Sequence, residues 1–368
     1  MDRQRAAHVA LAMTPGIGPA RLATLLAAFE TPHGALSAPF AFLCSLPGFS
    51  RAAATAVARA RVEDGEALLR RVAGMEASCL LPDDEAFPAM LREIPEPPTV
   101  LFARGDLDLL SRPAVAVVGS RDHSAYGAEA CRQVVTAAAR AGIVTVSGMA
   151  RGLDAQAHSQ TLDAGGGTIG VLGNGLGVVY PAANRGLYER VQREGLLLTE
   201  FPPGERPHAS SFPRRNRLIS GLARVIVVVE AARGSGTLIT VECGLAQGRD
   251  IMAVPGAITS PTSIGTNRLI RDGAAPYLEA EDLLACFGEL GAAAVRGTEA
   301  AGAQLRLEVD LSPEDRLVFE QVPPTGRQVD EIATAAGRTI PDVLGVLSAL
   351  ELQGVIEQLP GWLFRRTG

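Results

Sequence analysis

Short apolar runs alternate with helical stretches through the middle of the chain. The runs are apolar on both faces, and amphipathic stretches separate most of them. Strands buried on both faces and alternating with helices are typical of a parallel sheet covered by helices on both sides. The pattern predicts an α/β fold whose core is an extended Rossmann-like, doubly wound parallel sheet. The predicted strands are Ala114–Val118, Ile143–Val146, Thr168–Leu172, Leu196–Thr199, Val225–Val229 and Asp250–Val254.

Helical spacing without β-branched runs sets residues 1–80 apart from that core. Two Pro-Gly turns, Thr14–Pro19 and Leu46–Ser50, interrupt the spacing, which predicts an N-terminal helical domain. The first turn resembles half of a helix-hairpin-helix of the SAM-like kind. Such a turn either contacts a DNA phosphate or serves only in packing, and the sequence leaves both open. Proline and acidic residues then predict an irregular connection over 81–106, at the start of a core domain of residues 81–287.

The C-terminal region has the outline of a winged helix-turn-helix. A Gly/Ala-rich stretch, 288–311, predicts a linker, and residues 312–368 show three helical patterns followed by two short apolar strands. The last of these helices carries Asp342 and Glu351 and no internal arginine, whereas a helix that reads DNA is basic. A protein-docking or autoregulatory role is therefore the favoured interpretation. The predicted wing strands are Gly354–Glu357 and Trp362–Arg365.

The balance of charge excludes several classes of protein. Forty Asp and Glu face 34 basic residues, all of them arginine, and the net charge is −6. Without lysine there is no P-loop and no Schiff-base chemistry, so guanidinium groups and backbone N–H groups would hold any anion. The five cysteines form no C-x-x-C pair, which argues against zinc or a disulfide framework. No apolar run reaches the roughly 18 residues of a membrane span. We expect a cytoplasmic protein with no metal, no cofactor and no membrane contact.

Glycine-bearing turns follow four of the predicted strands. The carboxyl ends of parallel strands share one edge of the sheet, and ligands of open α/β sheets bind there, at the switch point. Glycines allow close backbone approach, and helices that begin at such turns direct free N–H groups at an anion. We therefore expect a polyanion or nucleotide site. The first turn is not G-x-G-x-x-G, which argues against an NAD site. The candidate binding residues of the turns are Gly119, Ser120, Arg121, Gly148, Arg151, Gly175, Ser235, Gly236 and Thr237.

The densest cationic feature is the segment Phe212–Ser220, which precedes the fifth predicted strand. Three arginines within four residues cannot all lie on one solvated helix face, so the segment is expected to contact phosphate. Its candidate binding residues are Arg214, Arg215, Asn216 and Arg217.

Asp154 and His158 are the residues that most resemble a catalytic pair. They are four residues apart on a predicted helix and therefore share a face. No third ligand has helical spacing, and no Ser or Cys nucleophile has a placed base. A structural hydrogen-bonded pair that fixes the start of the helix is the favoured interpretation, and no catalytic residue is expected.

Six motifs in unbroken order over roughly residues 80–285 closely resemble the DNA-processing protein A family, called DprA or Smf. The helical and winged-helix flanks match its longer members. The motifs are Val117–Arg121, Ser147–Asp154, Tyr180-Pro181, Phe212–Ser220, Ser235–Thr240 and Val254–Gly256.

The resemblance implies a bacterial single-stranded DNA-binding protein of natural transformation. Such a protein protects incoming strands, loads the RecA recombinase onto them, and dimerises through its Rossmann-like core. The family's DNA-binding positions correspond to Arg121 and to a pocket with Gly148, Arg151 and Ser235–Thr237. A lysine usually follows the Tyr-Pro pair, but here Ala182 stands there, which makes Arg185, one turn on, the candidate replacement.

An enzyme is the alternative. The stretch from Gly234 to Glu242 loosely resembles the P-G-G-x-G-T-x-x-E loop of nucleotide phosphoribohydrolases, which share a Rossmann-like core. Ser235 interrupts the paired glycines of that loop, and the arginine-rich segment exceeds what one monophosphate needs. A non-enzymatic DNA-binding mediator is therefore the favoured function.

Overall fold

The computed structural model of the chain describes residues 2–288, 290–291, 313–323, 326–352, 356–359 and 361–366. The chain forms two compact units, residues 1–296 and 297–368. Nearly all of the predicted linker, 288–311, lies outside the described residues. Among the residues described, no helix combines the length and apolar composition needed to cross a bilayer.

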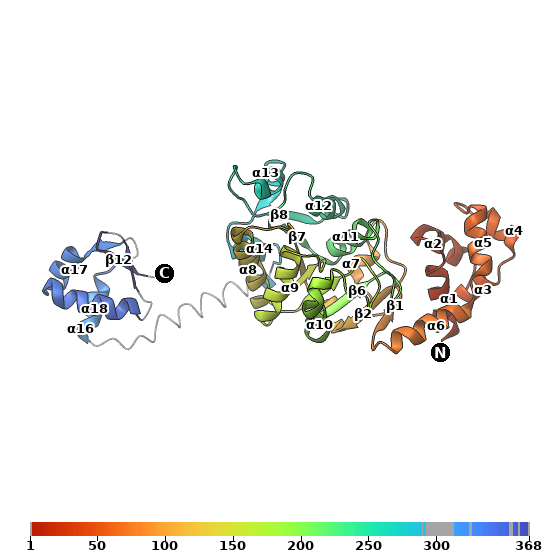
Figure 1. Cartoon of the computed structure of the whole chain (residues 1–368), viewed down its shortest axis with the longest axis horizontal. Coiled ribbons are helices and arrows are strands. Elements are labelled where there is room, and N and C mark those ends of the chain that lie inside the picture. Colours follow the sequence, from red (N-terminus) through yellow and green to blue (C-terminus); the bar gives the residue numbers. More distant parts are fainter. Residues whose placement is uncertain are drawn as a thin grey trace. The chain divides into compact units, whose positions relative to one another are not determined.

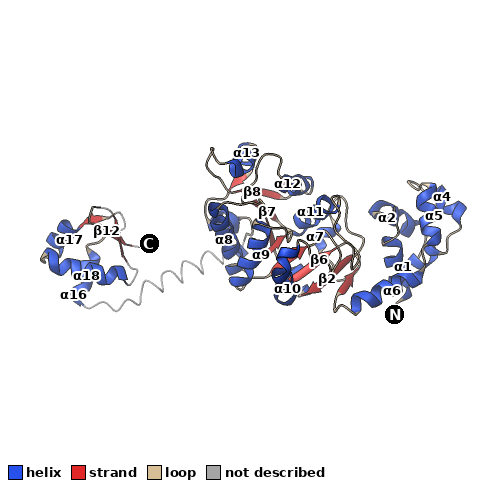
Figure 2. Cartoon of the chain, viewed as in Figure 1, coloured by secondary structure: helices blue, strands red, loops and turns tan. Residues whose placement is uncertain are grey.

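A nine-stranded sheet forms the centre of the first unit, in the order β1-β2-β6-β5-β4-β3-β7-β8-β9 (Figures 1 and 2). From β6 to β9 all neighbours are parallel, as the apolar runs predict. The inner strands are fully buried because helices cover both faces. The strands are β1 Ser78–Leu80, β2 Leu101–Gly105, β3 Ala114–Val118, β4 Val144–Ser147, β5 Thr168–Val171, β6 Leu196–Thr199, β7 Val225–Val228, β8 Asp250–Ala253 and β9 Ala275–Pro276.

Two layers of helices sandwich the sheet, which is the doubly wound arrangement (Figure 1). One layer consists of α8 (Ala125–Arg140), α9 (Leu153–Asp163), α10 (Arg185–Glu194) and α14 (Ala280–Ala285). The other contains α7 (Ala89–Arg92), α11 (Ser211–Leu222) and α12 (Thr237–Ala246), with α13 (Ile264–Arg271) beside β8. Short 3-10 turns are η1 Leu107–Ser111, η2 Ala182–Asn184 and η3 Pro261–Ser263.

The expected irregular connection over 81–106 is partly wrong. Strand β2 lies within it and pairs antiparallel with β6 on one side and β1 on the other. The sheet is therefore mixed at this edge rather than parallel throughout. Pro97 and Pro98 stand just before its apolar run and mask it. Phe102 is nevertheless completely buried, because helices of the N-terminal segment cover it. Tertiary packing overrides the local signal for a break.

The N-terminal segment is helical, as its spacing predicts (Figure 2). Its two Pro-Gly turns lie side by side, because Arg21 donates to the carbonyl oxygens of Gly16 at 2.6 Å and Gly48 at 2.8 Å. Both glycines have positive φ, 81° and 76°, where an L side chain would be strained. The helices are α1 Arg3–Ala12, α2 Pro19–Ala28, α3 Pro32–Leu36, α4 Phe40–Ser45, α5 Arg51–Arg59 and α6 Val62–Ala73.

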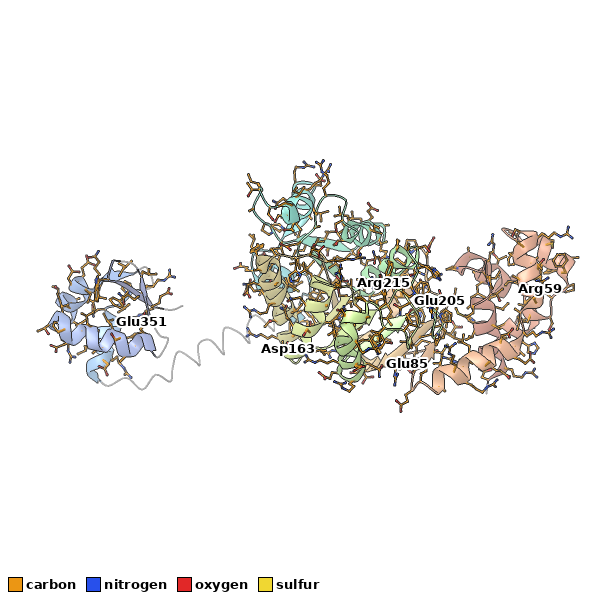
Figure 3. The ribbon with its side chains drawn as sticks, viewed as in Figure 1. Arg59, Glu85, Asp163, Glu205, Arg215 and Glu351 are labelled. Carbon is orange, nitrogen blue, oxygen red and sulfur yellow. The ribbon has the colours of Figure 1, made fainter. Side chains whose placement is uncertain are left out.

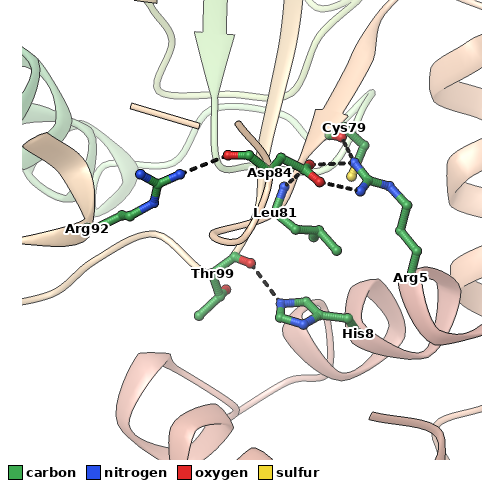
Figure 4. A network of polar contacts seen from close by, with 7 residues as sticks. All are labelled: Arg5, His8, Cys79, Leu81, Asp84, Arg92 and Thr99. Atoms are coloured by element: carbon green, nitrogen blue, oxygen red, sulfur yellow. Dashed lines mark hydrogen bonds and ion pairs between the residues drawn. The ribbon is translucent and has the colours of Figure 1, made fainter. Parts of the chain in front are cut away.

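A polar network joins helix α1 to the segment between β1 and β2 (Figure 4). The Arg5 guanidinium donates to both carboxylate oxygens of Asp84 at 2.8 Å and to the carbonyl oxygen of Cys79. Its hydrogen bonds hold the pKa of Asp84 below its usual range. One turn on, the ring N–H of His8 donates to the Thr99 carbonyl at 3.1 Å, and burial lowers the pKa of His8. The N-terminal helices are thus tied to the segment that leads into β2.

The second unit has the winged helix-turn-helix fold. Val343, Leu347 and Leu350 line up on one helix face and are buried against the other elements. Trp362, the only tryptophan of the chain, is 55% exposed in the turn between the two wing strands. Gly354 and Val355 of the predicted first wing strand lie outside the described residues. The elements are α16 Pro313–Glu320, β10 Arg327–Gln328, α17 Val329–Ala336, α18 Ile340–Leu352, β11 Ile356–Leu359 and β12 Leu363–Arg366.

Replacement of Arg5 by Ala is expected to lower the free energy of unfolding by about 1 kcal/mol, because a bidentate ion pair whose two side chains are 30% and 29% exposed is lost. The matched control is Arg3→Ala on the same helix, whose exposed side chain makes no contact within the described residues. Urea unfolding of both variants gives the comparison. Equal effects of the two changes would contradict the fastening role of Arg5.

Candidate nucleic-acid interface

A cavity of about 240 Å³ lies at the carboxyl edge of the sheet. The turns after β3, β4 and β5 and the first half of α11 surround it, so segments up to about a hundred residues apart in sequence meet there. The residues that line it are Arg121, Gly148, Met149, Ala150, Arg151, Leu172, Gly173, Asn174, Tyr180, Pro181, Phe212 and Arg215.

Two arginines supply the available positive charge of the cavity. Arg121 follows β3 and Arg151 follows β4, and both side chains are exposed. Neither guanidinium makes a hydrogen bond or ion pair with any other described residue. Their charge is therefore free to meet an anion.

The backbone N–H groups of the turns after β3 and β4 interact with a carboxylate of the protein, Asp154. The Asp154 carboxylate, which is 8% exposed, accepts from the N–H of Gly148 at 3.2 Å. Burial raises the pKa of Asp154, while Arg215 and the backbone N–H groups of Ala150, Gly148 and Gly119 oppose that rise. These N–H groups were expected to face a ligand. They face a carboxylate of the protein instead, because Asp154 begins α9 directly beneath the turns.

Arg215 is the one arginine of the cationic segment that lines the cavity. Figure 3 labels it among the side chains of the first unit. Its side chain is buried, and one guanidinium nitrogen donates to the carbonyl oxygens of Gly148 and of Val171, the latter at 2.6 Å. The Nε group donates to Asn216 at 3.2 Å. Burial lowers the pKa of Arg215 to about 10, and Asp154 opposes the shift. The group is a structural cation whose remaining edge faces the cavity.

The other two arginines of the segment bind a buried carboxylate. Arg214 and Arg217 pair with the Glu200 carboxylate at 2.9 and 2.6 Å, and Glu200 is 4% exposed. Arg214 also lies over the ring of Phe201. Neither residue lines the cavity, and Asn216 serves as a partner of Arg215. The three arginines do point in different directions, as the helix argument requires, but Arg214 and Arg217 share the single negative charge of Glu200.

Several other candidates lie near the cavity without lining it. Gly175 packs on the backbone of Pro202, whose oxygen would lie 1.9 Å from an added Cβ atom. In the turn of Ser235, Gly236 and Thr237, the Thr237 hydroxyl donates to the Gly119 carbonyl at 3.1 Å and braces that rim. Arg185 is exposed at the start of α10 and makes no contact within the described residues.

The switch point between β3 and β7 is closed by a carboxylate. Glu230, 1% exposed, accepts from the N–H and hydroxyl of Ser124 at 3.0 and 2.5 Å and from the Thr262 hydroxyl at 3.0 Å. An anion would be repelled there. The residues that line the cavity follow β3, β4 and β5, and β4 and β5 lie on the side of β3 away from β7. The expected ligand site at the switch point stays a prediction.

Asp154 and His158 do not form the expected hydrogen-bonded pair. Asp154 is directed at the Gly148 turn, whereas His158 bonds to the Thr168 hydroxyl at 2.7 Å. Burial lowers the pKa of His158 to about 3, so the ring is neutral at physiological pH. Each residue is structural, but each has its own partner.

Two aromatic residues of the cavity were not among the sequence candidates. Tyr180 and Phe212 have ring centroids 5.5 Å apart, and Tyr180 is 48% exposed. Asn184, also not a candidate, donates its amide to the carbonyl oxygens of Met149 and Ala150 at 3.0 and 3.1 Å. Both aromatics belong to the six motifs named above, Tyr180 to Tyr180-Pro181 and Phe212 to Phe212–Ser220. Membership of these motifs is the signal from which the sequence could have indicated them.

Fold and cavity together define a Rossmann-like protein with arginines over a cavity at the carboxyl edge of its sheet and a separate winged helix. The family model of DNA recombination-mediator protein A matches residues 78–288, and that of the DprA winged helix domain matches residues 303–361. The chain belongs to the DprA/Smf family.

Relatives and solved structures are similar over most of their own lengths. Protein Smf of Synechocystis is 32% identical over 99% of both chains. DNA processing protein DprA of Streptococcus pneumoniae is 45% identical over 55% of this chain and 72% of its own. The X-ray structure of the S. pneumoniae protein superposes on this chain with a TM-score of 0.67 and 33% sequence identity. The match covers 77% of this chain and 98% of that one. A second solved structure, of DNA processing protein A from Helicobacter pylori, is described as showing its single-stranded DNA binding mode. It superposes with a TM-score of 0.51 and 28% identity, and the match covers 56% of this chain and 94% of that one.

Replacement of Gly148 by Ala is expected to destabilise the protein by about 1–3 kcal/mol through overpacking. The added Cβ atom would lie 2.6 Å from Arg215 and 2.7 Å from the Asp154 carboxylate. Gly236→Ala is the control, because nothing lies within 4 Å of its Cβ position. Thermal unfolding measures both, and a Gly148→Ala variant as stable as the control would show that the turn is looser than described.

Proposed function

We propose that the protein binds single-stranded DNA at the cavity, without reading its sequence. The observation that carries the proposal is the pair of exposed, unpaired guanidinium groups of Arg121 and Arg151 on the lining of one cavity. Guanidinium is suited to bidentate phosphate contacts. The printed description of the H. pylori relative, single-stranded DNA binding, supports the same ligand class.

Phosphate contact rather than base readout follows from the groups available. Charged contacts to phosphates carry no sequence information. Tyr180 offers one exposed ring for stacking, which tolerates any base. A cavity at a sheet edge admits one flexible backbone more readily than a stiff duplex. We therefore expect single strands to bind more tightly than duplexes and homopolymers to differ little.

The salt dependence of binding tests the proposal. If the two free arginines each neutralise one phosphate, the log–log slope is about −1.4 per protomer, at roughly 0.7 per phosphate of a single strand. Arg121→Glu should weaken binding about tenfold or more and flatten the slope by about 0.7. The measurement is fluorescence anisotropy of a labelled oligonucleotide at graded salt.

The matched control for Arg121→Glu is Arg140→Glu. This charge reversal lies at the far end of α8, where the exposed side chain also makes no contact within the described residues. Its affinity should stay close to that of the natural protein. If both reversals weaken binding equally, only the overall charge matters, and the cavity is not where the strand lies.

The proposal includes the absence of catalysis. A phosphoribohydrolase needs a glutamate directed at a ribose, yet Glu242 is exposed on α12 and the residues lining the cavity carry no carboxylate. Incubation with nucleoside monophosphates and assay for free base separates the two functions, and release of base would favour the enzyme.

We extend the proposal to the place of the protein in the cell. Protection of incoming strands in natural transformation, loading of RecA onto them, and a cytoplasmic location are what membership of the DprA/Smf family supports. The winged helix then fits a docking or regulatory role, since α18 carries Asp342 and Glu351. Faster RecA filament formation on single-stranded DNA is the result to look for.

A homodimer through the Rossmann-like core is also part of the proposal. Its supporting observation is the exposure of large apolar side chains in the segments that flank β8 and β9 along the chain, where Ile258 is 91%, Leu278 68% and Leu245 63% exposed.

The double substitution Ile258→Glu with Leu278→Glu is therefore expected to shift the protein toward monomer at micromolar concentration, with unchanged circular dichroism. Sedimentation equilibrium measures the shift. A dimer of undiminished strength would place the interface elsewhere.

A further inference from the structure

Gly148 stands between two buried groups of opposite charge. Its carbonyl oxygen accepts from Arg215, and its N–H donates to Asp154 at 3.2 Å. An added Cβ atom would touch both groups, at 2.6 and 2.7 Å. Arg215 and Asp154 make no direct ion pair, so the glycine separates them while each favours the charged form of the other.

The Asp154 carboxylate occupies a position that otherwise suits an external anion. Backbone N–H groups from the turns after β3 and β4 favour its charged form, those of Gly119, Gly148 and Ala150. Such clusters of N–H groups beside a helix start are typical of phosphate sites. Here the anion belongs to the protein.

Arg215 retains one unsatisfied edge toward the cavity. Its Nε group and one terminal nitrogen donate within the protein, while the second terminal nitrogen makes no hydrogen bond to any described residue. Arg215 lines the cavity together with the free Arg121 and Arg151. A phosphate held by those two arginines would approach Arg215 and, behind it, the negative charge of Asp154.

We propose that Asp154 is a resident anion that competes with DNA phosphate for Arg215, and that it thereby limits the affinity of the cavity for single-stranded DNA. The inference rests on the proposed function. Asp154 acts through Arg215 and Gly148 and is a positioning residue. Its charge cancels that of Arg215, so the phosphate meets two net positive charges instead of three.

The test is Asp154→Asn in the full chain, with a labelled oligothymidylate as the probe. The amide can still accept from Gly148 while the charge is removed. Because Arg215 then lacks its counter-charge, affinity at low salt should rise about three- to tenfold. The log–log salt slope should steepen by about 0.7, the contribution of one further phosphate contact.

The matched control is Asp122→Asn, an exposed carboxylate next to Arg121 in sequence whose side chain makes no hydrogen bond or ion pair with the described residues. Water and salt screen its charge, so affinity should change less than about twofold. Weaker binding by Asp154→Asn with an unchanged slope would overturn the proposal and leave Asp154 a purely structural residue. Equal tightening by both variants would also overturn it.

A second variant keeps the proposal testable if Asp154→Asn does not fold. Asp154→Asn combined with Arg215→Gln removes both buried charges, so neither is left without the opposite charge nearby. The proposal predicts that this double variant has the same log–log salt slope as the natural protein. A slope flatter by about 0.7 would show that Arg215 neutralises a phosphate despite Asp154, which overturns the competition. If the natural protein itself binds no single-stranded DNA, the proposed function fails instead.

Discussion

The carboxyl edge of the sheet depends on one buried guanidinium. From α11, on one face of the sheet, Arg215 reaches the carbonyl oxygens that end β5 and follow β4. A buried carbonyl left without a donor costs about 1–3 kcal/mol, so these bonds fix the two turns relative to each other. The Gly148 turn then leads into the exposed Arg151, and its N–H group donates to the carboxylate of Asp154. The cavity is thus a product of a charge that solvent barely reaches.

Positive charge in the sequence and positive charge at the surface differ in this protein. The cationic segment supplies three arginines, but two of them share the single negative charge of Glu200 and the third is buried beside Asp154. The two arginines of the turns, which stand alone in sequence, keep their charge free. An acidic chain can therefore present a local positive site without any long basic stretch, because no carboxylate stands among the described residues that line the cavity.

The sequence predicts the parallel strands well, because runs such as Ala114–Val118 are strong local signals. The turns after three of these strands, which the sequence singles out, border the cavity, and their role in binding stays a prediction. The sequence does not predict β2, since prolines mask its apolar run and long-range pairing with β6 creates it. Nor does it predict the direction of side chains in the cationic segment or the engagement of N–H groups by Asp154. These depend on which buried charge lies within reach in three dimensions, and spacing along the chain carries no such information.

The single tryptophan gives the two units of the chain separate optical signatures. Trp362 lies half-exposed on the winged helix, while the sheet unit holds none. Tryptophan emission therefore follows the smaller unit alone, whereas far-ultraviolet dichroism is dominated by the helices of the larger one. A protein that melts in two stages would reveal each stage through a different signal, so the independence of the two units can be examined without any label or truncation.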